Sequence, residues 1–89
     1  MLHMAPPNSA KRKIEPQHAK HLRGKLAEGV RRVMEAKGLS VRRLAVRMHT
    51  SRSLLYRLLS GQQDSITLRS IARLAVALQV TISVHIDEP

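Results

Sequence analysis

Apolar residues recur at helical spacing through most of the chain and at strand spacing near its C-terminus. Between residues 18 and 37 they return every three or four positions, which predicts a helix with one apolar stripe: Leu22, Leu26, Val30, Val33 and Met34. Gly38 follows directly, where a helix C-terminus favours a left-handed residue. The pattern therefore predicts that a first helix ends at residue 37.

Three shorter segments each begin with a hydroxyl residue that can cap a helix, namely Ser40, Ser51 and Thr67. Each segment also carries one apolar face that we expect to be buried. These faces are Val41, Leu44, Ala45 and Met48, then Leu55, Leu58 and Leu59, then Leu68, Ile71, Leu74, Ala75 and Leu78. Gly61 ends the second segment. Residues 18–79 are therefore predicted to form a mainly α domain of four to five helices.

Residues 80–86, VTISVHI, alternate strictly between apolar and polar and are mostly β-branched, which predicts a strand. One strand cannot satisfy its own backbone groups. The simplest partner is the same strand of a second copy across a two-fold axis, so Val80, Ile82, Val84 and Ile86 are predicted to form a homodimer interface. The alternative is a strand that packs on its own domain. Residues 87–89 are predicted as a short tail.

Residues 1–17 are predicted to form a flexible basic tail, because Pro6, Pro7 and Pro16 interrupt any helix there. The tail carries the basic run Lys11, Arg12 and Lys13. This run either solvates the tail or contacts nucleic acid.

Charge sets the class of partner. The 89 residues contain 16 Lys and Arg against 6 Asp and Glu, which gives a net charge of +10. Residues 38–61 hold five arginines and no acidic residue, whereas residues 62–89 hold two arginines and three acids. Such a concentration predicts a polyanionic partner. The alternative is a solvated basic face on a helical bundle that binds protein.

Other chemistries find little support in the sequence. His18 and His21 have a spacing that can chelate, but no third ligand is nearby, so we expect no metal and no cofactor. Few acids and no glycine-rich phosphate loop argue against an enzyme. No apolar run is long enough to span a membrane, and Tyr56 is the only aromatic residue that could anchor a basic helix at one. The lack of cysteine fits a reducing cytoplasm.

The stretch LSVRRLAVRMHTSRSLLYRLLSG, residues 39–61, resembles the helix-turn-helix of the phage-repressor-like (Cro/XRE-type) family. The residues that match its cap, core and closing-glycine positions are Leu39, Leu44, Ala45, Met48, Ser51, Leu55, Leu58 and Gly61. The chain departs from the family at His49, where a glycine is usual, and at Val41, where a phosphate-binding glutamine is common. His49 is expected to adopt a left-handed conformation.

The resemblance implies a lambda-repressor-like fold whose third helix, residues 52–60, enters the major groove of double-stranded DNA. It implies base reading by the outward residues Arg52, Ser53, Leu54 and Tyr56. It implies phosphate binding by Arg42, Arg43, Arg47, Ser51, Arg57 and Ser60. The expected function is a sequence-specific transcriptional regulator, a repressor that binds an inverted repeat as a homodimer.

The C-terminal stretch DSITLRSIARLAVALQVTISVHI is similar to the end of antitoxins of the HigA and HipB kind. Those antitoxins repress their own operon and bind a toxin protein. The resemblance therefore implies a second function, in which the chain neutralises a toxin partner. The same ending also occurs in solitary regulators of the family.

Overall fold

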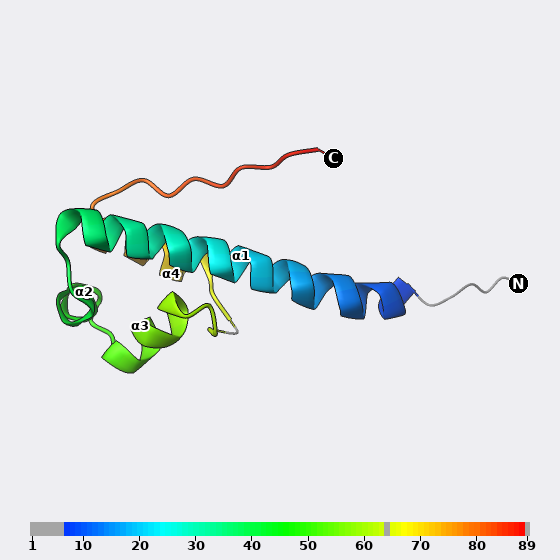
Figure 1. Cartoon of the computed structure of the whole chain (residues 1–89), viewed down its shortest axis with the longest axis horizontal. Coiled ribbons are helices and arrows are strands. Elements are labelled where there is room, and N and C mark those ends of the chain that lie inside the picture. The colour runs from blue at the N-terminus through cyan, green and yellow to red at the C-terminus, as the bar shows by residue number, and fades with distance from the viewer. Residues whose placement is uncertain (1–6, 64, 89) are drawn as a thin grey trace, which may run out of the picture.

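The computed structural model describes residues 7–63 and 65–88, and these residues form four helices and no strand (Figure 1). The helices are α1 (Pro7–Lys37), α2 (Val41–Met48), α3 (Arg52–Leu59) and α4 (Leu68–Leu78). In Figure 1, α2 and α3 lie against the C-terminal half of α1, and its N-terminal half extends beyond the bundle. The mainly α helix-turn-helix architecture is confirmed.

Hydroxyl caps start the three shorter helices at the predicted residues. Each cap residue has extended backbone angles, and its side-chain oxygen accepts a hydrogen bond from a backbone N–H in the first turn. The bonds run from Arg43 N to Ser40 Oγ (3.1 Å), from Leu54 N to Ser51 Oγ (3.1 Å) and from Ser70 N to Thr67 Oγ1 (3.0 Å). The starts of these helices are therefore determined locally.

Left-handed residues follow the helices. Gly38 and Gly61 have φ of 62° and 75°, conformations that glycine adopts without steric cost. His49, with φ 53°, takes the left-handed conformation expected of it. Gln79 also has a positive φ of 57°, which the sequence pattern did not predict. The backbone turns sharply at each of these points, so the helices pack on one another.

The core is aliphatic and draws on all four helices. Its largest fully buried side chains are Leu44, Leu55, Leu74 and Leu78. Val30 and Met34 contribute the α1 side of this core. Two residues predicted to be buried are not, because Leu22 is 57% exposed and Leu68 is 79% exposed. Leu68 is the first residue of α4, before the helix turns its apolar face inward.

The predicted tail is wrong for residues 7–17, because α1 already begins at Pro7 and includes Pro16. Pro7 is the first helical residue, where a missing N–H costs nothing. Pro16 removes one hydrogen bond from the helix interior, yet Lys, Arg, Ala, Glu and Gln around it all favour helix. Residues 1–6 of the predicted tail lie outside the described residues.

The predicted C-terminal strand does not form within residues 7–63 and 65–88. Residues 80–86 run as an extended segment back alongside α1 (Figure 1). Val80 and Ile82 pack against the core, while Val84 and Ile86 are 79% and 85% exposed. Alternation prepares a chain for pairing, but a strand exists only when another strand supplies its hydrogen bonds.

Candidate nucleic-acid interface

The outer face of α3 carries the residues predicted to read bases. Arg52 and Ser53 are exposed at the start of the helix, and Tyr56 is 60% exposed one turn later. Leu54 lies between this face and the core and is 38% exposed. The opposite face is buried through Leu55, Leu58 and Leu59. The helix therefore presents two arginines, Arg52 and Arg57, together with a hydroxyl and a phenol on one accessible side.

The residues predicted to bind phosphate fall into two groups. Arg42, Arg43 and Arg57 are exposed, and none of their guanidinium groups makes a hydrogen bond or an ion pair with the described part of the chain. Ser51 uses an oxygen lone pair as the α3 cap and keeps its hydrogen for another acceptor. These four residues are able to donate to an anion.

Arg47 and Ser60 have other partners. The Nη1 atom of Arg47 donates to the carbonyl oxygen of Ala77 at 3.0 Å. The hydroxyl of Ser60 donates its single hydrogen to the carbonyl oxygen of Arg57 at 3.0 Å. An anion needs donors, so Ser60 in this conformation has none to offer. The contacts thus separate these two residues from the other predicted phosphate ligands.

The exposed arginines lie near the positive ends of helix dipoles. Arg42 and Arg43 occupy the first turn of α2, and Arg52 is the first residue of α3. No acidic residue occupies either first turn. A cation at a helix N-terminus is unfavourable by itself, whereas an anion there is stabilised by the dipole and by free N–H groups. The arrangement is therefore suited to binding negative charge.

Other basic residues are placed in the opposite way, at helix C-termini, and sequence reasoning missed them. Their side chains donate to backbone carbonyl oxygens at the ends of α2, α3 and α4. The bonds are Arg73 to Met48 O, Arg31 to Leu59 O, Arg23 to Gly61 O (3.3 Å), and Lys37 to Leu78 O (2.7 Å) and Gln79 O (3.2 Å). Each pair is 25 to 42 residues apart in sequence, so no local spacing reveals it.

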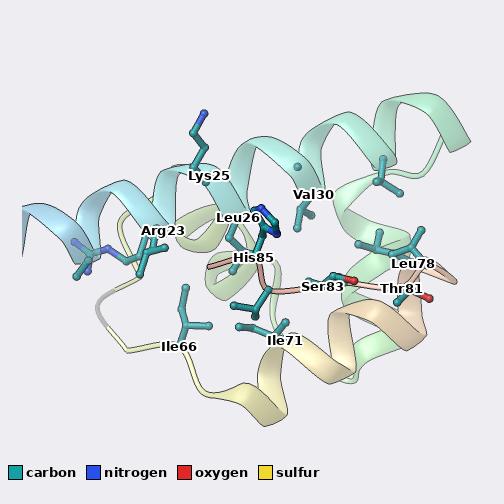
Figure 2. A pocket seen from close by; sticks show the side chains of 17 residues that line it. Arg23, Lys25, Leu26, Val30, Ile66, Ile71, Leu78, Thr81, Ser83 and His85 are labelled. Atoms are coloured by element: carbon teal, nitrogen blue, oxygen red, sulfur yellow. The ribbon is translucent and has the colours of Figure 1, made fainter. Parts of the chain in front are cut away.

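An apolar groove of about 830 Å³ lies between α1 and the C-terminal segment (Figure 2). Three of the four residues predicted to form a dimer interface line it, Val80, Ile82 and Val84. Leu26 and Val30 contribute from α1, and Ile66 and Ile71 contribute from the chain before α4 and from α4 itself. The groove is separate from the arginine-bearing face of α2 and α3.

The described residues hold no cluster of three or more His, Cys, Asp or Glu that could bind a metal ion. His18 and His21 stack with ring centroids 6.3 Å apart on the exposed side of α1. None of the described helices is long and apolar enough to cross a membrane.

Comparison with known proteins supports this description. Residues 25–85 match a protein-family model described as a helix-turn-helix domain. The crystal structure of the restriction-modification controller protein C.AhdI from Aeromonas hydrophila is similar, with a TM-score of 0.62 and 32% sequence identity. That match covers 66% of this chain and 88% of the controller protein. No curated protein matches the chain at a significant level.

Proposed function

This chain belongs to the helix-turn-helix family of the Cro/XRE-like kind, and on that premise we propose that it is a DNA-binding transcription regulator that places α3 in the major groove of a specific operator. The observation that carries the proposal is the placement of the exposed arginines. Arg42, Arg43 and Arg52 stand in the first turns of two helices, where they cost stability until an anion arrives. A protein that binds the DNA backbone gains from this arrangement.

In this proposal Arg52 is the principal base reader, because a guanidinium pairs in bidentate fashion with guanine. Ser53 and Tyr56 supply further polar contacts from the same face. Leu54 is accessible enough to contact a thymine methyl group. Arg42, Arg43, Ser51 and Arg57 bind phosphates on either side and set the orientation of α3.

We also propose that the regulator acts as a homodimer on an inverted repeat and represses transcription there. Support for the dimer comes from the C-terminal segment, in which the apolar side chains of Val84 and Ile86 are largely exposed. Its extended backbone is unpaired within the described part of the chain. A two-fold dimer would place two α3 helices about 34 Å apart, one turn of DNA.

The test is selection of bound duplexes from a random pool, followed by affinity measurements on the selected site. Arg52→Ala should cost roughly 1–3 kcal/mol on that site and relax preference at one base pair. Arg57→Ala should weaken binding to every duplex and lower the dependence of affinity on salt. Arg69→Ala is the matched control, because Arg69 is an exposed arginine on α4, away from this face.

The wild-type protein gives the decisive result. Recovery of an inverted repeat with half-sites roughly 10 base pairs apart supports both the function and the dimer. Six or more phosphate contacts predict a loss of affinity of about a thousandfold between 50 and 200 mM salt. Failure to enrich any sequence, together with affinity that hardly changes with salt, would overturn the proposed function.

A more particular candidate function is control of restriction-modification genes, and the likeness to C.AhdI favours it. The neighbouring reading frames discriminate. Genes for a methyltransferase and an endonuclease beside this one would support control of restriction-modification. A small toxin gene would instead support the antitoxin prediction, which stays a prediction.

A further inference from the structure

We propose that Arg31 and Arg73 are positioning residues that orient the α3 helix for sequence discrimination without touching DNA. The inference rests on the proposed function, since it concerns how α3 is held against its operator. It separates the basic residues into two groups by the end of the helix dipole that each one meets.

Arg73 holds the turn that precedes α3. Its Nη2 atom, from the middle of α4, donates to the carbonyl oxygen of Met48, the last residue of α2. The left-handed residue His49 follows directly, and Ser51 then caps α3. The Met48 carbonyl faces the turn, so its hydrogen bond fixes where the chain leaves α2 and where α3 begins.

Arg31 holds the other end of α3. Its Nη1 atom, from α1, donates to the carbonyl oxygen of Leu59, the last residue of the helix. Arg23, two turns earlier on α1, reinforces this end through the bond from its Nε atom to Gly61 O at 3.3 Å. The last carbonyls of a helix have no partners of their own, and a cation there also favours the dipole.

These bonds attach α3 to two different helices, one at each end. The helix is only eight residues long, so a small rotation about its buried leucines would move Arg52 and Tyr56 relative to base edges. The packing of Leu55, Leu58 and Leu59 keeps α3 on the core but contains no directional contact. The two guanidinium groups supply the directional contacts.

The experiment compares Arg31→Gln and Arg73→Gln with wild type on two duplexes, the one selected from a random pool and a scrambled one of equal composition. Each variant should lose about tenfold in preference for the selected duplex, which is the size of one lost base contact. Binding to the scrambled duplex, and its salt dependence, should stay unchanged. Arg31→Lys and Arg73→Lys keep one donor and should restore most of the preference.

Two controls isolate positioning from other effects. Thr67→Ala removes the α4 cap and should lower thermal stability without changing the preference ratio. Arg57→Gln should instead lower the salt dependence on both duplexes. All affinities are measured at temperatures where circular dichroism shows each variant folded.

Several results would overturn the proposal. If the glutamine variants keep the wild-type preference ratio, the two arginines only stabilise the fold. If they lower the salt dependence on scrambled DNA, they contact phosphate directly. Amide hydrogen exchange gives an independent reading: exchange in α3 should accelerate about fivefold or more in both glutamine variants, while α1 is unaffected. A wild type that selects no duplex refutes the proposed function, and the exchange data still test the attachment of α3.

Discussion

Reversing the charge of two arginines on α2 should change stability in opposite directions. Arg43 lies in the first turn of the helix, near the positive end of its dipole. Arg47 lies in the last turn and donates to Ala77 O at 3.0 Å. Arg43→Glu and Arg47→Glu change the net charge of the protein by the same amount, so each variant serves as the other's control.

For Arg43→Glu, an unfavourable cation is replaced by a favourable anion, each worth about 0.3–1 kcal/mol at an exposed helix end. The new carboxylate also completes a capping box with Ser40, whose hydroxyl already accepts from the N–H of residue 43 at 3.1 Å. We expect the free energy of unfolding to rise by roughly 1 kcal/mol, which raises Tm by about 4–8 °C in a domain of this size.

For Arg47→Glu, the hydrogen bond to α4 is lost and an anion is placed beside the negative ends of two helices. The free energy of unfolding should fall by roughly 1–2 kcal/mol. Thermal unfolding followed by circular dichroism at low salt and fixed protein concentration measures both shifts. The gain from Arg43→Glu should shrink in high salt, because the exposed charge is screened.

The same substitution tests the DNA proposal, because Arg43→Glu should weaken binding and lower the salt dependence by about one unit for each lost phosphate contact. A Tm that rises in both variants would show that relief of general charge repulsion dominates. That result would refute the assignment of the two arginines to opposite ends of helix dipoles.

Three further substitutions test the core, a turn and the C-terminal segment. Leu44→Ala should lower the free energy of unfolding by about 2–5 kcal/mol, because Leu44 is fully buried, and urea denaturation measures the loss. Gly38→Ala should cost about 1 kcal/mol in the same assay, because φ of 62° strains any residue with a Cβ, and an unchanged midpoint would contradict this. Val84→Asp, at a site 79% exposed in the single chain, should leave helicity intact but give monomers in sedimentation, and a persistent dimer would move the interface elsewhere.

Much of this fold could be predicted because its signals are local. Hydroxyl caps at Ser40, Ser51 and Thr67 start the three shorter helices, and the left-handed Gly38 and His49 end α1 and α2. Each involves groups only a few residues apart, so residue type and spacing determine the contact. Apolar periodicity likewise identified the buried face of α3.

Local signals were misleading where competing preferences were close. Pro16 predicted a break, yet the surrounding helix-forming residues continue α1 through it. Alternation over residues 80–86 predicted a strand, but alternation describes only how side chains would face. Whether a strand forms depends on a second strand, and the described part of the chain supplies none.

The sequence by itself determined the helix-turn-helix, the aliphatic core and the concentration of arginines from residue 38 to 61. Only the tertiary structure decided what each cation does. Arg42 and Arg57 are left exposed for a partner, whereas Arg47 is bound to a carbonyl at the end of α4. The reason is geometric: a guanidinium finds an unpaired helix C-terminus through space, across 25 to 42 residues of chain, and no pattern along the sequence encodes that distance.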